Sequence, residues 1–72
     1  MEIELFGQLA EGREAIWEEE ILQPLTVHEL AEKFCLDIEL VGLISIDGKQ
    51  SHWNDLVTNE NRICFFPYLE GG

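Results

Sequence analysis

Basic residues are scarce in this 72-residue chain. Only 4 Lys and Arg residues stand against 15 Asp and Glu, which gives a formal net charge of -11. Nucleic acids and anionic membranes bind through basic side chains, so this charge argues against both as partners. It favours a basic protein partner and a fast, salt-sensitive encounter. One acidic run, Glu18–Glu20, is expected to be a solvated edge.

Cysteine is also scarce, and the two residues present, Cys35 and Cys64, do not make a disulfide framework. The first residues lack the basic region of a secretion signal, and no apolar run approaches the roughly 20 residues of a membrane span. We therefore expect a cytoplasmic protein with reduced thiols. Both cysteines are expected to pack as small hydrophobic side chains, Cys35 at a helix end and Cys64 in a strand.

Candidate catalytic residues are few. Ser45 and Ser51 have no evident His and Asp partners. His28 and His52 have no accompanying ligand cluster, so surface or hydrogen-bonded histidines are expected rather than metal ligands. A chain this short buries only about 60% of its unfolded surface, which leaves little room for an enclosed active site. We expect no metal, no bound cofactor and no enzymatic activity of the chain on its own.

The first half of the chain carries clear element signals, and a hydrophobic share of 46% argues against disorder. Glu2–Phe6 alternates and predicts a half-buried strand. Residues 14–22 fit a strand or a short helix, and a strand is favoured because a better helix start follows. There Thr26 and Glu29 form a capping box ahead of an apolar stripe, which predicts a helix from Val27 to Cys35.

The second half reads as strands. Leu43–Ile46 predicts a buried strand, Asp47-Gly48 a hairpin turn, and a short strand is expected around Gln50–Trp53. The last strand, Ile63–Phe66, is expected to stop pairing at Pro67, which lacks a backbone donor. One amphipathic helix on a mixed sheet of about four to five strands is a two-layer α+β domain.

A short tail follows this domain. The expected division is a folded unit over residues 1–67 and an extended tail over residues 68–72. The tail carries the pair Gly71-Gly72. Because glycine lacks a Cβ, Gly71 would let the tail thread a narrow site and bring the Gly72 carboxylate to a reacting partner. The plain alternative is a frayed chain end.

The element order resembles the ubiquitin-like β-grasp fold, and the tail resembles one family within it. The segment Ile63–Gly72 is similar to the tail of the small subunit of molybdopterin synthase, because it has two phenylalanines, a proline and a terminal diglycine. The segment Leu5–Glu11, the helix start Thr26-Val27 and the Asp47-Gly48 hairpin also match. Thiamine-pathway sulfur carriers share the features outside the tail. Tyr68 stands where the family has a second proline, so the receiving pathway stays open.

The resemblance implies the chemistry of a sulfur carrier. An E1-like adenylating enzyme would use ATP to convert the Gly72 carboxylate into an acyl adenylate. A sulfur donor would then leave a thiocarboxylate at Gly72, for delivery to the larger catalytic subunit of molybdopterin synthase. The alternatives are a carrier for thiamine or tungsten-cofactor synthesis, a ubiquitin-like modifier joined through Gly72 to a lysine, and a non-covalent binding module.

The resemblance also locates a partner interface. In a β-grasp fold the first and last strands are neighbours, and strand alternation turns both Phe6 and Phe66 away from the core. These two aromatic residues are expected to form one exposed apolar patch beside Pro67 and Tyr68, and such patches mark interfaces. The alternative is that they only cover the far face of a thin sheet.

Overall fold

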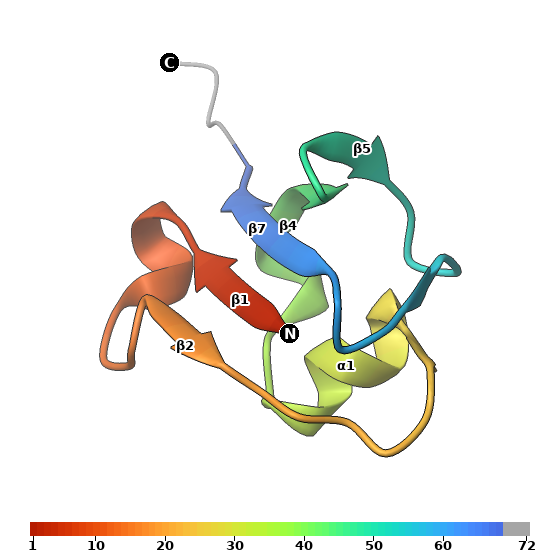
Figure 1. Cartoon of the computed structure of the whole chain (residues 1–72). Coiled ribbons are helices and arrows are strands. Elements are labelled where there is room, and N and C mark those ends of the chain that lie inside the picture. Colours follow the sequence, from red (N-terminus) through yellow and green to blue (C-terminus); the bar gives the residue numbers. More distant parts are fainter. Residues whose placement is uncertain (69–72) are drawn as a thin grey trace.

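The computed structural model describes residues 1–68, so the predicted reacting pair Gly71-Gly72 lies outside the described residues. A five-stranded sheet in the order β2-β1-β7-β4-β5 packs on one α-helix (Figure 1). A second sheet of two strands pairs β3 with β6. The elements follow in the order β1 (Glu2–Leu5), the 3-10 helix η1 (Gly7–Ala10), β2 (Ile16–Glu18), β3 (Leu25–Thr26), α1 (Val27–Lys33), the 3-10 helix η2 (Ile38–Leu40), β4 (Val41–Ile46), β5 (Lys49–Ser51), β6 (Leu56–Val57) and β7 (Arg62–Pro67).

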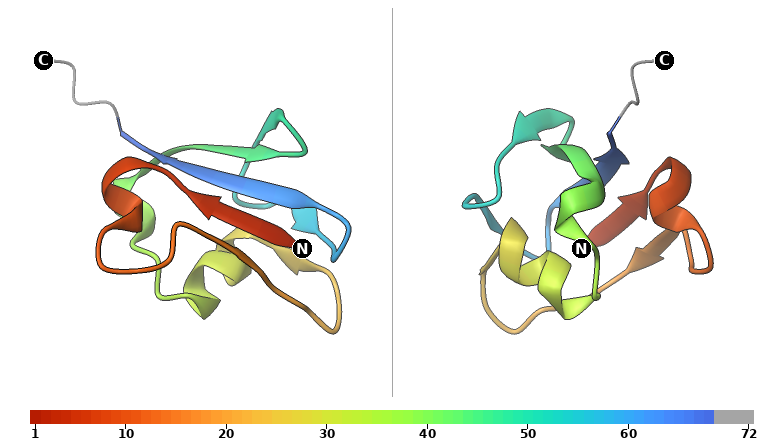
Figure 2. Two further views of the ribbon diagram at one scale, coloured as in Figure 1. Left: turned by 60° about the vertical axis from the view of Figure 1, so that its left-hand side comes forward. Right: turned by 180° about the vertical axis from the view of Figure 1, so that it is seen from behind.

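The sheet is mixed, as predicted. β1 runs parallel to β7, while its other neighbour β2 is antiparallel. Figure 2 shows β1 and β7 side by side, with α1 below them in the left view. The strand interpretation of residues 14–22 is confirmed by β2, although only three of those residues form it. The small β3–β6 sheet was not predicted, because strands of two residues leave no periodic signal.

The core lies between the sheet and α1. Every second residue of β1 and β7 points toward the helix, because successive side chains of a strand lie on opposite faces of the sheet. The helix meets them with one face, whose residues recur every three to four positions. The largest fully buried side chains are Phe65, Ile3, Leu30, Ile63, Val27 and Val57. None of the helices within residues 1–68 has the length and apolar character that a membrane crossing requires.

The start of α1 is as predicted. The Thr26 hydroxyl accepts the Glu29 backbone N–H at 3.1 Å, and the Glu29 carboxylate accepts the Thr26 backbone N–H at 2.9 Å. Two donors that the first helical turn leaves unpaired are thereby satisfied. The capping box therefore fixes where the helix begins.

The end of α1 differs from the prediction. The helix stops at Lys33, and Cys35 adopts a left-handed backbone with φ 56°. The Cys35 N–H bonds Glu32 O at 3.1 Å and the Leu36 N–H bonds Ala31 O at 3.0 Å, which closes the helix as glycine usually does. This geometry exposes Cys35, so the expectation that it packs in the interior was wrong, whereas Cys64 is buried as expected.

Strand β4 starts two residues before the predicted segment, and a bulge between Val41 and Leu43 shifts its register. Leu43 is 41% exposed, so the expectation of a fully buried strand was wrong at this position. The hairpin is confirmed, since Asp47 and Gly48 have φ values of 53° and 84°. Both values are typical of the turn that joins tightly paired strands. The following strand, β5, spans Lys49–Ser51, so it begins one residue earlier and ends two residues earlier than expected.

Strand β7 includes Pro67, and backbone pairing continues past it. Pro67 lies opposite Val41, and the Tyr68 N–H donates to Leu40 O at 3.2 Å. The expectation that pairing stops at Pro67 was wrong because backbone donors alternate in direction. The backbone nitrogen of Pro67 points to the β1 side of β7, but β1 has already ended there, since its chain turns away at Gly7. No hydrogen bond is lost there.

Candidate functional site

An apolar groove of about 540 Å³ lies at the end of β1 and β7, on the sheet face opposite to α1. The rings of Phe6 and Phe66 stack there, with centroids 4.5 Å apart and planes inclined by 11°. The predicted aromatic patch is therefore present, with both residues half-buried. The lining residues are Phe6, Gly7, Gly42, Leu43, Phe66, Pro67 and Tyr68.

Strand register brings these side chains together. Leu5 lies beside Phe65 in the parallel pair, and the Phe6 N–H donates to Phe65 O at 3.0 Å. Phe6 is thereby held next to Phe66. On the other side of β7, Leu43 lies opposite Phe66 in the antiparallel pair with β4. Three strands that are distant in sequence thus supply one apolar surface, which the sequence could place only in part.

Two glycines flank the chain where it leaves the sheet. A Cβ on Gly42 would lie 2.9 Å from Tyr68 Cα and 3.1 Å from Pro67 O. A Cβ on Gly7, whose φ is 57°, would lie 3.0 Å from Pro67 Cγ. Any other residue at 42 would press on the backbone at Pro67–Tyr68. Sequence reasoning did not single out Gly42, although a glycine inside a strand is a signal for a bulge or a close backbone approach.

The exit segment is anchored on one side and open on the other. Tyr68 is held through its backbone N–H, while the residue as a whole is 59% exposed and lines the groove. Pro67 is half-buried. The groove therefore lies directly beside the residue from which the predicted tail continues toward Gly71 and Gly72, which are outside the described residues.

The other end of this sheet face is charged. Arg62 Nε lies 2.8 Å from Glu2 Oε2, and Arg62 Nη2 lies 2.8 Å from Glu4 Oε1. The hydrogen bond to Glu4 raises the pKa of Arg62 above its already high value. Cys64 lies between Arg62 and Phe66 along β7, where it is buried. The face thus divides into an apolar end beside Tyr68 and an ion-paired end away from it.

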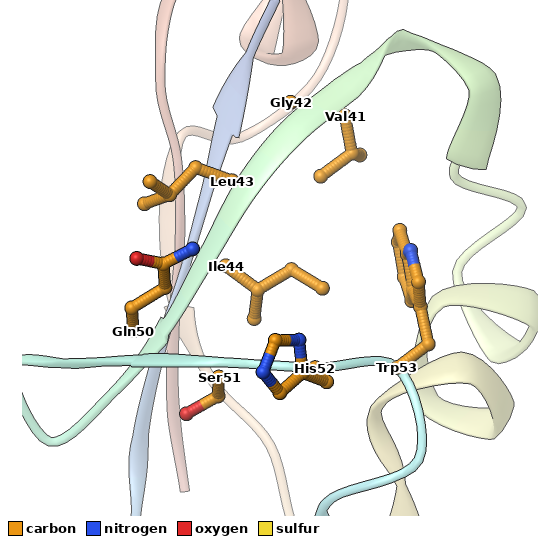
Figure 3. A pocket seen from close by; sticks show the side chains of 8 residues that line it. All are labelled: Val41, Gly42, Leu43, Ile44, Gln50, Ser51, His52 and Trp53. Atoms are coloured by element: carbon orange, nitrogen blue, oxygen red, sulfur yellow. The ribbon is translucent and has the colours of Figure 1, made fainter.

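A smaller hollow of about 130 Å³ lies between β4 and the chain from Gln50 to Trp53. Figure 3 shows Leu43 and Gln50 on one side of it and Trp53 on the other. The Ser51 hydroxyl donates to Lys49 O at 3.0 Å, so its proton is directed at the backbone and not at His52. This hollow therefore offers no nucleophile paired with a base.

The histidine on α1 has a carboxylate partner. His28 Nδ1 lies 2.9 Å from Glu32 Oε1, one helical turn away, as expected for a satisfied histidine. Among residues 1–68 no group of three His, Cys, Asp or Glu side chains is arranged to hold a metal ion.

Comparisons with known proteins bear on the fold. No protein-family model matches the chain, and a search of curated proteins gave no match. Among solved structures, a crystal structure of SAMP1 from Haloferax volcanii matches with a TM-score of 0.76 and 17% sequence identity, covering 99% of this chain and 97% of that chain. At that identity the likeness concerns the fold alone. The chain has the ubiquitin-like β-grasp fold, as the element order had implied.

Proposed function

We propose that this protein is a sulfur carrier, activated at Gly72, that donates sulfur in molybdopterin synthesis as the small subunit of the synthase. The supporting observation is the apolar groove beside Pro67 and Tyr68, at the root of the segment that holds the glycine pair. A partner that docks in this groove lies next to the tail, so recognition and chemistry are brought together. The chain is not an enzyme on its own in this proposal.

Gly72 supplies the reacting group. Its carboxylate is a poor electrophile, so an oxygen of that carboxylate first attacks the α-phosphate of ATP, which forms an acyl adenylate and releases pyrophosphate. Hydrosulfide then attacks the carbonyl carbon, a C–S bond forms, and the C–O bond to AMP breaks with its electron pair leaving on AMP. A proton is released and a thiocarboxylate remains. An E1-like adenylating enzyme binds the ATP, and Gly71 lets the tail enter that site because it lacks a side chain.

The groove supplies recognition. The stacked pair Phe6 and Phe66, with Leu43 beside it, offers rigid apolar area of the kind that carries most of the binding energy at interfaces. The strongly acidic surface speeds encounter with basic partners. The adenylating enzyme and the larger catalytic subunit would use this same surface in turn, because each must hold the tail.

The chemistry is tested by intact mass spectrometry after incubation with an adenylating enzyme, ATP and sulfide. Replacement of one oxygen by sulfur, absent when Gly72 is deleted, is the expected result. A covalent adduct on a lysine of another protein would instead support the modifier alternative. An unchanged mass with a competent adenylating enzyme would refute activation. Transfer of the sulfur to a pterin precursor, compared with a thiazole precursor, separates molybdopterin synthesis from thiamine synthesis.

The docking surface is tested by the double variant Phe6→Ala/Phe66→Ala. We expect binding to the adenylating enzyme to weaken about 100-fold or more, because both aromatic anchors are lost. The free energy of unfolding should fall by only about 1–2 kcal/mol, since the rings stack on each other and not in the core. Leu56→Ala is the matched control, since Leu56 is 63% exposed and belongs to the other sheet. Unfolding of the double variant would show that the pair is structural.

A further inference from the structure

Strand β2 leaves one edge of the five-stranded sheet open, at the outer margin seen in Figure 1. The backbone hydrogen bonds that join the β2 segment to the β1 segment involve only every second residue of the β2 segment. The Leu5 N–H donates to Ala15 O at 2.7 Å, and the Glu19 N–H donates to Met1 O at 2.8 Å. Because backbone groups alternate in direction, the N–H and C=O groups of Ile16 and Glu18 point away from β1. Among residues 1–68 no strand pairs with that edge.

A groove of about 530 Å³ runs along this open edge. Its wall is an aromatic pair, Trp17 of β2 and Phe34 at the end of α1, packed edge to face with centroids 5.1 Å apart. Arg13 holds the wall in place, because its guanidinium lies 5.8 Å from the Trp17 ring centre and its Nη2 donates to Phe34 O at 3.0 Å. The open backbone edge and the aromatic wall are thus adjacent, since Trp17 belongs to β2 itself.

The rim of the groove is acidic. Glu14, Glu18 and Glu19 line it, and the Glu18 side chain is 77% exposed. Glu19 Oε2 lies 3.5 Å from the Lys33 ammonium, and Glu18 Oε2 lies 3.6 Å from the N-terminal ammonium of Met1. Glu14 is exposed and Glu18 stays largely exposed beside its N-terminal partner, so an external cation can reach both carboxylates.

We propose that the β2 edge binds an extended segment of a partner protein in which apolar and basic residues alternate. The segment adds a strand through the outward backbone groups of Ile16 and Glu18. The residue opposite Trp17 shares its side of the sheet and enters the aromatic groove, while basic residues meet Glu14 and Glu18. This surface is separate from the Phe6–Phe66 groove, and the inference does not depend on sulfur chemistry.

Charge selects this occupant over a second copy of the chain. Two copies joined edge to edge would bring Glu14 and Glu18 of each close to the same residues of the other, and like charges opposite one another destabilise paired strands. With a net charge of -11, the approach of two copies is also opposed at long range. A basic segment avoids both the local repulsion between glutamates and the long-range repulsion between two acidic chains.

The probe is a synthetic peptide of about eight residues that alternates valine and lysine, titrated into the full chain and followed by amide chemical shifts. A serine–lysine peptide of equal charge is the comparison. We expect the valine peptide to bind about tenfold more tightly and to shift the amides of Ile16 and Glu18 most. Glu14→Gln/Glu18→Gln should weaken it about three- to tenfold.

The matched pair of variants is Ile16→Pro and Gln50→Pro. Each variant removes a backbone N–H that points outward from one of the two edges of the sheet, where proline is tolerated. In β5 this N–H belongs to Gln50, because the hairpin register turns it away from β4. Ile16→Pro should reduce binding about tenfold or more, and Gln50→Pro should not change it. If Ile16→Pro does not fold, the proposal is decided by which amides of the natural chain change their chemical shifts when the valine peptide is added. Equal binding of both peptides, shifts away from β2, or dimerisation of the chain through β2 would overturn the proposal.

Discussion

At the scale of single residues, Cys35 holds a backbone conformation that its side chain disfavours. It occupies the position after α1 where glycine is most common, with φ 56°. A residue with a Cβ pays a steric cost in this region that glycine does not. The hydrogen bonds of Cys35 and Leu36 to Glu32 and Ala31 hold it there.

Cys35→Gly should therefore stabilise the protein by about 0.5–1 kcal/mol, since relief of the steric cost exceeds the extra freedom that glycine gives the unfolded chain. Urea unfolding of both proteins measures the difference. Cys35→Ala keeps the Cβ and should show no such gain. Equal stability of the Gly and Ala variants would mean that the left-handed backbone carries little strain.

Gly42 is the second residue with a local demand, because the backbone of Pro67–Tyr68 passes against it. Gly42→Ala should lower the free energy of unfolding by about 1–3 kcal/mol, as the added methyl group must displace backbone atoms. It should also speed hydrogen exchange of the Tyr68 amide, which bonds Leu40 O. Ser45→Ala on the same strand is the control. Unchanged exchange at Tyr68 would show that the bulge in β4 absorbs the methyl group.

At the scale of elements, the capping box makes the stability of α1 depend on pH. Hydrogen bonds from Thr26, first from its backbone N–H and then from its side chain, lower the pKa of Glu29. A carboxylate whose pKa is lower in the folded state stabilises that state above its unfolded pKa, near 4.5. That contribution is lost as pH falls through the lower folded value.

Glu29→Gln keeps a hydrogen-bond acceptor but removes the charge. The difference in unfolding free energy between the natural chain and this variant should be largest near about pH 6 and should shrink toward about pH 3. Glu60→Gln, in an exposed turn, should show no comparable change. A difference for Glu29→Gln that is constant with pH would mean that the charge does not contribute to the cap.

The elements also show which local signals were sufficient. The Thr26–Glu29 box and the Asp47-Gly48 turn were predicted correctly because each is a complete bonding unit within four residues or fewer. The end of α1 was predicted two residues too late, since it is closed by a cysteine where sequence rules look for glycine. The pairing at Pro67 was misjudged because it depends on where β1 ends, about sixty residues earlier in the chain.

At the scale of the whole molecule, net charge dominates. The Cα radius of gyration is 11.5 Å, well below the Debye length of about 30 Å at 0.01 M salt, so at low salt every acidic group repels the others. Ion pairs such as Arg62 with Glu2 and Glu4 are exposed and offset little of this repulsion.

Raising NaCl from about 0.01 M to about 0.5 M should therefore increase the free energy of unfolding, by about 1–2 kcal/mol. Urea is the suitable denaturant because it is uncharged, and sucrose in place of salt is the control for effects other than screening. A decrease with salt would show that the ion pairs outweigh the net repulsion.

The sequence by itself determined the Asp47-Gly48 turn, the helix start, the buried faces of β1 and β7 and the acidic character, because each depends on neighbours in the chain or on composition. The sequence also predicted that Phe6 and Phe66 lie together beside Tyr68. Only the tertiary structure decided that Leu43 joins them in one groove, and that Gly42 makes room for the chain beside it. Only the sheet order left the β2 edge open beside Trp17 and Phe34. Such surfaces depend on strand register between distant segments, which no local pattern encodes.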